Sequence, residues 1–298
     1  MNKTLQDLVR KDLCPDGIWQ PTNIIKSVLK YQISRLPKAK VEDIEIRIPQ
    51  NPPLMRAFLI KFFTRHYFQI QNSLIDYMTS QDFLNAAKSG RLQILDVGCG
   101  PAVASLAITE MFGRILEHLE DMGEWPKGKI VKMNYILNDT SDICLATGQR
   151  ILEHYFHIGR QDNLRTIHNM SFAIEKAFPA NINQLKRISL NLGMYDIANF
   201  SYVVESFKDK SSFQNLVNGL SETEKLCNPA GKILIIIDKF NMPFTRRLTK
   251  AMGVSSSKQL LTQLVYPKRN ANETFSYKYY RYLYSPSNAQ ANKFSVVA

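Results

Sequence analysis

The sequence predicts an α/β protein in which helices cover both faces of a mainly parallel sheet. From residue 92 onward, apolar segments with strand character alternate with segments of helical periodicity. Residues 1–90 lack this alternation and show mainly helical patterns. A chain of 298 residues is long enough for one large α/β domain with an extension. We therefore expect a helical cap over residues 1–90 and an α/β domain over residues 91–298.

The N-terminal region contains two helical stretches that are separated by a break. Apolar residues from Ile24 to Ile33 follow helical spacing, and an aromatic-rich stretch runs from Leu54 to Asn85. The segment Ile48–Pro53 lies between them and ends in two prolines. Because proline lacks the amide hydrogen and clashes with the preceding helical turn, no helix is expected to cross this segment.

The α/β domain is expected to follow a regular order of strands and helices. We expect strands at Leu92–Val97, Ile130–Leu137, Leu164–Ile167, Tyr195–Val204, Lys232–Asp238 and Phe275–Tyr284. We expect helices at Ala102–Asp121, Asp142–His157, about 211–227, Pro243–Met252 and Ser257–Val265. The last strand should find a partner among the final residues. Right-handed crossovers bring the carboxyl ends of parallel strands to one edge, where ligands bind.

The segment Ile94–Ala102 carries the most specific signal. An apolar strand is followed by Gly98 and Gly100, which permit a sharp turn and a close approach of the backbone to a ligand. A helix begins next, so that a nucleotide-like cofactor could lie at its N-terminus. Asp96 stands just before the glycines, where its carboxylate would repel a pyrophosphate but not a cofactor that carries a positive charge.

In these residues the chain resembles the class I S-adenosylmethionine-dependent methyltransferases, whose first motif runs Asp-x-Gly-x-Gly-x-Gly. Asp96, Gly98 and Gly100 match this motif, and Ala102 replaces the third glycine. The resemblance covers roughly residues 90–285. It implies a Rossmann-like, seven-stranded methyltransferase sheet whose last strand is antiparallel, and S-adenosyl-L-methionine as the cofactor. The alternative is an ordinary strand–helix turn of another α/β protein.

Further cofactor-binding candidates follow the second and third strands. Asp139 ends the second strand, where an acidic side chain can accept hydrogen bonds from ribose hydroxyls. It could instead cap the next helix, a role that Asp142 could also fill. The resemblance implies that residues after the third strand frame the adenine with a polar group and an apolar side chain. Asn169 and Met170 fit those roles.

Two residues after the fourth strand are candidates for catalysis. The resemblance implies that this edge lies beside the transferred methyl group. Tyr202 or Glu205 could orient an acceptor, and Glu205 could take its proton. Alternatively, Tyr202 packs and Glu205 caps the following segment. Methyl transfer depends mainly on alignment and on the exclusion of water, so no universal catalytic residue is expected.

The sequence Asn51-Pro52-Pro53-Leu54 is similar to the Asn-Pro-Pro-aromatic motif of enzymes that methylate amino groups of DNA and RNA. Here leucine replaces the aromatic residue. The segment also precedes the glycine turn, whereas in the common order the motif follows the fourth strand. We therefore interpret it as a structural turn.

The net charge of +12 lies on the flanks of the expected catalytic core. Residues 241–298 contain nine Lys or Arg and one Glu, whereas residues 91–240 are nearly neutral. Such a flank can attract RNA, DNA or another anionic surface, although many proteins with basic flanks bind none of these. Phe275–Tyr284 also interleaves aromatic with basic residues, which could stack bases or simply pack in a strand. RNA contact is predicted for Arg246, Arg247, Lys268, Lys278 and Arg281.

The sequence thus favours an enzyme that transfers a methyl group to an O or N acceptor, with RNA or a ribonucleoprotein as the favoured acceptor. A small-molecule acceptor under an apolar N-terminal lid is one alternative. A catalytically inactive methyltransferase-like binding protein is another. No metal site is indicated, because the four cysteines form no Cys-x-x-Cys pair. No apolar run could span a bilayer and no signal peptide is visible, which predicts a cytoplasmic protein.

Overall fold

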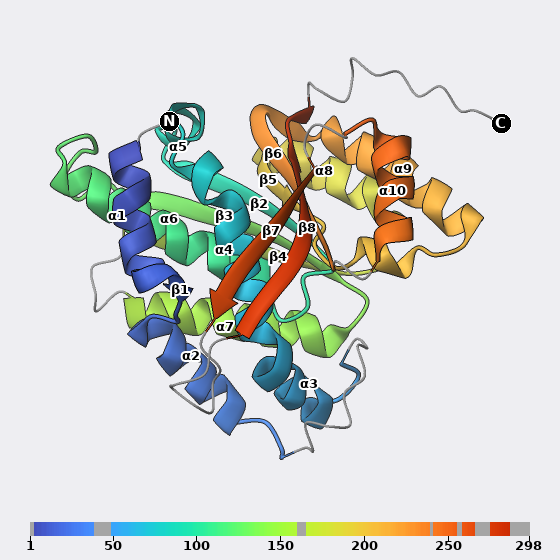
Figure 1. Cartoon of the computed structure of the whole chain (residues 1–298), viewed down its shortest axis with the longest axis horizontal. Coiled ribbons are helices and arrows are strands. Elements are labelled where there is room, and N and C mark those ends of the chain that lie inside the picture. The colour runs from blue at the N-terminus through green and yellow to red at the C-terminus, as the bar shows by residue number, and fades with distance from the viewer. Residues whose placement is uncertain are drawn as a thin grey trace.

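The computed structural model describes residues 3–38, 49–159, 165–238, 241–254, 258–265 and 275–286, and within them an eight-stranded sheet has helices on both faces (Figure 1). The strands are β1 (Ile18–Trp19), β2 (Arg91–Val97), β3 (Val131–Asp139), β4 (Thr166–Glu175), β5 (Tyr195–Asn199), β6 (Cys227–Asp238), β7 (Lys258–Val265) and β8 (Phe275–Tyr284). The N-terminal helices are α1 (Lys3–Leu13), α2 (Asn23–Ser34), α3 (Pro52–Phe58), α4 (Thr64–Met78) and α5 (Gln81–Ala87). The later helices are α6 (Val103–Asp121), α7 (Asp142–Gly159), α8 (Ile182–Leu192), α9 (Lys210–Glu224) and α10 (Met242–Met252).

The strand order confirms the predicted Rossmann-like class of sheet. The strands lie in the order β1-β7-β8-β6-β5-β2-β3-β4. The central strands β2 to β6 pair in parallel, whereas β8 is antiparallel to both of its neighbours, β6 and β7. The last strand therefore runs as the resemblance implies. The strand count is eight and not seven, because the two-residue β1 of the N-terminal region pairs with β7.

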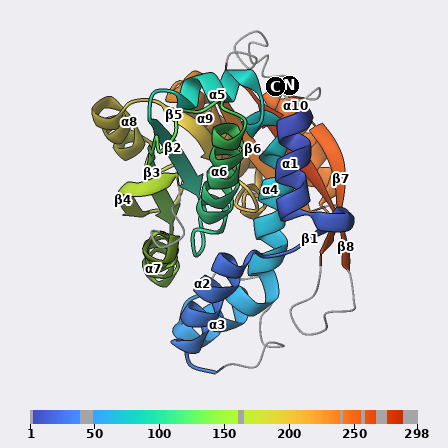
Figure 2. The same ribbon diagram turned by 90° about the vertical axis from the view of Figure 1, so that its left-hand side faces the viewer.

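Each face of the sheet has its own apolar core. Successive strand residues point to opposite faces, so Ile94 joins one core and Leu95 the other. On one face α6 lies between the sheet and the N-terminal helices, and Figure 2 shows α1 and α4 alongside it. This position explains why α6 is buried around most of its circumference. The helices α8, α9 and α10 lie together on the other side in Figure 1.

A buried polar junction attaches the N-terminal region to α6. Glu110 of α6 accepts hydrogen bonds from Thr22, Tyr67 and Gln71. Burial raises the pKa of this carboxyl, and the hydrogen bonds from Thr22 and Tyr67 oppose that rise. The three donors come from the residue before α2 and from α4, so one side chain fixes two segments of the N-terminal region on the sheet-covering helix.

The segment with two prolines begins a helix, where the sequence predicted a structural turn. Asn51 is the N-cap of α3, and its side-chain oxygen accepts a hydrogen bond from the amide of Leu54 at 3.0 Å. Pro52 and Pro53 occupy the first helical positions, where the missing amide hydrogen costs nothing. A π-helical turn, η3 (Leu59–Phe63), then joins α3 to α4.

Several predicted boundaries are wrong. The largest error is at Ser257–Val265, where the structure has the strand β7 and not a helix. The run of paired leucines there fits both periods, and its pairing with β8 decides the outcome. That pairing also supplies the partner of the last strand, while the final residues 287–298 lie outside the described residues. The third strand extends to Glu175, the fourth ends at Asn199, and β1 and α8 were not predicted.

None of the described helices combines the length and the apolar character that a membrane crossing requires.

Candidate cofactor-binding site

Four of the six predicted cofactor residues, Asp96, Gly98, Gly100 and Asp139, lie at the carboxyl edge of three neighbouring strands. Asp96 of β2 lies opposite Asn199, the last residue of β5, and Val97 lies opposite Asn138 of β3. Asp139 ends β3 one residue later. The sheet register therefore gathers Asp96, the glycine turn and Asp139, as the order of parallel strands predicts.

The turn between β2 and α6 depends on left-handed backbone conformations. Gly98 and Gly100 have φ angles of +63° and +51°, and Ala102 has a φ of +55°. A glycine would suit the position of Ala102 better, because a side chain makes this conformation unfavourable. Helix α7 approaches the turn closely at Gly148, where an added Cβ would lie 2.9 Å from the backbone nitrogen of Ala102.

Asp96 is a junction inside the protein. Its side chain is 0% exposed, and its two oxygens accept hydrogen bonds from Asn199 Nδ2 at 2.8 Å, Ser105 Oγ at 2.8 Å and the Ser105 amide at 3.1 Å. Burial raises its pKa to about 6, although the hydrogen bonds from Asn199 and Ser105 oppose the rise. The carboxyl ties the start of α6 to the end of β5 and so positions the glycine turn.

Sequence reasoning did not single out Asn199. It is polar, 2% exposed and ends an otherwise apolar strand. Its side-chain oxygen accepts hydrogen bonds from the amide and the hydroxyl of Ser201. Its polar side chain at the carboxyl end of a buried strand could have indicated, in the sequence, that it belongs to the site.

Asp139 accepts hydrogen bonds from backbone amides of the glycine turn and of the residue that precedes α7. One oxygen accepts from the Gly100 amide at 2.8 Å, and the other accepts from the Ser141 amide at 3.0 Å. Burial raises the pKa of this carboxyl, and the bonds from Gly100, Ser141 and Thr140 oppose the rise. An ionised carboxylate has about four acceptor positions. Gly100, Ser141 and Thr140 take three of these positions, and because Asp139 is 7% exposed, unlike Asp96, the fourth position is open to a ligand hydroxyl.

Val203 and Phe58 cover the glycine turn. A Cβ at Gly98 would lie 2.6 Å from Val203 Cβ, so only glycine permits this contact. Over Gly100 there is more room, because the nearest side-chain atom, Phe58 Cζ, would be 3.9 Å from an added Cβ. Phe58 comes from α3, so the N-terminal region reaches the predicted cofactor edge. It was predicted only as part of an aromatic-rich stretch.

Tyr202 lies in a strained turn and belongs to an aromatic stack. Its φ of +66° is unusual for a bulky residue. Its ring stacks on His66 with centroids 3.9 Å apart, and its hydroxyl donates to Gln69. Phe62 stacks on the same histidine at 5.9 Å. Burial, assisted by the neighbouring Arg65, lowers the pKa of His66 to about 3, so this imidazole is neutral at pH 7.

Glu205 caps the end of β6. Its Oε1 accepts from the Asp238 amide at 2.8 Å, and Asp238 also pairs with Arg65 of α4. Burial and the nearby Asp238 carboxylate raise the pKa of Glu205. The sequence left open that Glu205 caps the segment that follows it, whereas the structure places its carboxylate on the end of β6.

Asn169 and Met170 do not lie where the sequence placed them. Met170 pairs with Asn134 midway along the β3–β4 pair, at the edge of the sheet, and Asn169 donates to the Asn134 side chain at 2.7 Å. The prediction that they follow the third strand is wrong, because β4 continues to Glu175, which pairs with Asp139. Asn169 is the extra residue of a bulge in the β3–β4 pair, and in the sequence the polar residues His168 and Asn169 look like the end of a strand.

The predicted basic residues have different environments. Arg281 is 7% exposed and donates to Ser73 and Gln259, so it belongs to the protein interior. Arg247 lies 3.8 Å above the ring of Phe213. Arg246 and Lys278 are exposed. The remaining predicted contact, Lys268, lies outside the described residues.

The residue types at this edge are those that the resemblance implies for a cofactor site: a glycine turn, a carboxylate at the end of β3 and apolar side chains. Val203 and Phe58 pack over the turn, and a Cβ at Gly100 would be in ordinary van der Waals contact with Phe58. Within the described ranges, no three His, Cys, Asp or Glu side chains are grouped to hold a metal ion.

No protein-family model matches the chain, and no curated protein matches it. Among solved structures, similar ones include precorrin-6Y C5,15-methyltransferase from Geobacter metallireducens, with 10% identity, a TM-score of 0.39 and coverage of 70% of this chain and 89% of that chain. Ribosomal protein L11 methylase from Lactobacillus delbrueckii has 13% identity, a TM-score of 0.35 and coverage of 72% and 77%. Precorrin 8W decarboxylase from Methanobacterium thermoautotrophicum has 14% identity, a TM-score of 0.36 and coverage of 65% and 81%.

Proposed function

We propose that the chain is an S-adenosylmethionine-dependent methyltransferase. The observation that carries the proposal is the glycine turn between Asp96 and Asp139, at the carboxyl edge of a parallel sheet with one antiparallel strand, β8. When bound, S-adenosyl-L-methionine supplies an activated methyl group on a sulfonium. The chain has to bind this donor, align an acceptor with it and exclude water.

Each edge residue then has a distinct task. Asp139 holds the turn through Gly100 and would accept a hydrogen bond from a ribose hydroxyl of the donor with its remaining acceptor position. Asp96 acts through the turn as a positioning residue, because it has no exposed surface. Burial keeps the pKa of Tyr202 well above its usual value, so the phenol stays protonated. Its proton is donated to Gln69, and its oxygen would orient the acceptor by accepting a hydrogen bond.

The acceptor that we propose is RNA or a ribonucleoprotein. The support is the charge of residues 241–298, in which the only acidic residue is Glu273. A second candidate is a small planar acceptor. The half-buried rings of Phe62, His66 and Tyr202 at the predicted transfer edge favour it, because they offer aromatic surface for stacking.

Binding of the donor tests the common core of the proposal. We expect S-adenosylmethionine or S-adenosylhomocysteine to raise the melting temperature of the wild-type protein, because a ligand of the native state stabilises it by RT ln(1 + [L]/Kd). In calorimetry, Asp139→Asn should weaken donor binding at least tenfold. Asp142→Asn, an exposed carboxyl three residues further on, is the matched control and should leave binding within twofold.

The proposal fails if the folded wild-type protein shows neither a heat of binding nor a thermal shift at millimolar donor. The site assignment fails if Asp139→Asn and Asp142→Asn behave alike. Radiolabelled donor with total RNA, and separately with a small-molecule extract, then distinguishes the two acceptor classes. Donor binding without transfer to either would favour the inactive binding protein.

A further inference from the structure

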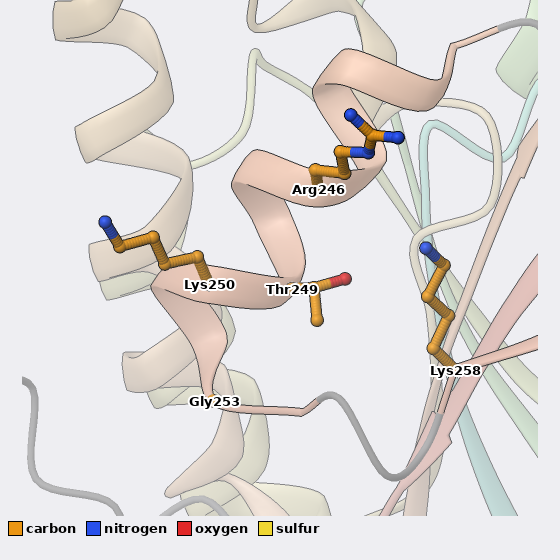
Figure 3. A pocket seen from close by; sticks show the side chains of 5 residues that line it. All are labelled: Arg246, Thr249, Lys250, Gly253 and Lys258. Atoms are coloured by element: carbon orange, nitrogen blue, oxygen red, sulfur yellow. The ribbon is translucent and has the colours of Figure 1, made fainter.

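A basic pocket lies between α10 and β7, away from the glycine turn. It has a volume of about 370 Å³. Figure 3 shows Thr249 and Lys258 beside the gap between helix and strand, Arg246 above it, and Lys250 directed to the opposite side of the helix. The pocket, which we call the α10–β7 pocket, is lined by Arg246, Thr249, Lys250, Gly253 and Lys258.

The cations of this pocket have no acidic neighbours in sequence or strand register. From residue 241 onward, the described residues contain no Asp or Glu. The Lys258 ammonium lies 4.5 Å from the centroid of the Tyr280 ring, and it forms no ion pair with a carboxylate of the described residues. Arg247, one residue after Arg246, instead stacks on Phe213 and donates to the Lys208 carbonyl. On α10, Arg247 therefore has a packing role, whereas Arg246 lines the pocket.

The strand register extends the pocket into a basic track. Lys258 pairs with Tyr282, and four residues further along β7, Thr262 pairs with Lys278 of β8. Opposed residues of an antiparallel pair lie on the same face of the sheet, so Lys258 and Lys278 share one face. Four strand residues span about 14 Å. Leu260, which is 51% exposed, lies between them on that face.

The track ends near the predicted transfer edge. Lys278 is adjacent to Tyr279, which pairs with Asp238 at the carboxyl end of β6. The strand β6 lies between β8 and β5, so β8 is two strand spacings, about 10 Å, from the strand that ends before Tyr202. A linear ligand that lies along Lys258 and Lys278 would therefore arrive at the edge where the acceptor has to bind.

We propose that the α10–β7 pocket binds the phosphodiester backbone of a single RNA strand and that Lys278 guides this strand toward the transfer edge. Regularly spaced phosphates are the ligand that a line of uncompensated cations beside a partly apolar surface fits best. The C-terminal end of α10 disfavours an anion, and the cations outweigh this effect. The inference rests on the proposed function for its acceptor and names the surface that would hold it.

Charge reversal in the pocket tests the inference. A fluorescent single-stranded RNA 20-mer is titrated with the wild-type protein and with Arg246→Glu/Lys258→Glu, by anisotropy between 50 and 200 mM salt. Loss of two phosphate contacts should weaken binding at least tenfold at 50 mM salt. It should also reduce the slope of log K against log salt by about 1.4. The matched control is Lys26→Glu/Lys30→Glu, two exposed lysines on α2, which should stay within twofold of the wild type.

The inference is overturned if the two double variants lose affinity equally, if the wild type binds no RNA at 50 mM salt, or if a DNA 20-mer of the same sequence binds more tightly than the RNA. Donor binding by the same variants separates this inference from the proposed function. The pocket variant should bind S-adenosylhomocysteine like the wild type. RNA binding that depends on the pocket, in a protein that binds no donor, would uphold the pocket and reject the methyltransferase.

Discussion

The substitution Asp96→Asn tests whether this carboxyl is a buried junction. In the folded protein its pKa is raised from 3.8 to about 6 by burial. Between these two values the folded protein keeps a proton that the unfolded chain has already lost. The stability that this group contributes is therefore fully present below pH 4 and is lost as the pH rises through about 6. At 1.36 kcal/mol per pKa unit, the change amounts to about 3 kcal/mol.

Asparagine has the same shape but does not titrate, so it removes this dependence. We expect Asp96→Asn to destabilise the protein by about 3 kcal/mol more at pH 4 than at pH 7. The variant also places the side-chain NH2 group of asparagine against the donors of Asn199 or Ser105. This lowers the free energy of unfolding by about 1–3 kcal/mol more at every pH.

Urea unfolding at pH 4, 5, 6 and 7 measures the effect. The fluorescence of Trp19 and Trp125, which are 2% and 3% exposed, reports the transition. Asp142→Asn, at an exposed position, is the control and should show no such trend. A difference between Asp96→Asn and the wild type that is constant across this pH range would refute the assignment of Asp96 as a buried carboxyl with a raised pKa.

Three further predictions concern the packing of the glycine turn, each measured by thermal and urea unfolding. Ala102→Gly should leave stability unchanged or raise it by up to about 1 kcal/mol, because φ is +55°, and a loss above 1 kcal/mol would contradict this. Gly148→Ala should destabilise by about 1–3 kcal/mol, since its Cβ meets the Ala102 backbone; an unchanged midpoint would show that α7 can move away. Gly98→Ala should destabilise by a similar amount, and Val203→Ala should recover part of this loss in the double variant; strict additivity would mean that the two residues do not touch.

The sequence predicted the centre of the fold better than its margins. The segments around β2, α6 and α10 were predicted within a residue or two, because a strong apolar pattern there ends at a turn or a proline. The strand β7 was predicted as a helix because its leucines fit either period. Only pairing with β8, a contact between segments that are not adjacent in the sequence, distinguishes the two. The same holds for β1, whose two residues form a strand only through their contact with β7.

The candidate site shows a similar division. A turn motif is local, so the positions of Gly98, Gly100 and Asp139 could be read from the sequence. The residues that cover the turn, Phe58 and Val203, come from other parts of the chain, and no local pattern relates them to it. Asn169 was misplaced because a bulge inside β4 looks like the end of a strand.

The two acidic residues of the site differ in what a substitution can reveal. Asp96 has no exposed surface, and its oxygens accept hydrogen bonds from Ser105 and Asn199. Its loss therefore loosens the turn whether or not the methyl donor binds there. A loss of donor binding in Asp96→Ala would therefore not separate binding from folding. Asp139 also holds the turn, but it retains an acceptor position, and its substitution can weaken a ligand beyond its effect on stability. The informative measurement is thus donor affinity in Asp139→Asn, compared at equal folded fraction with the wild type.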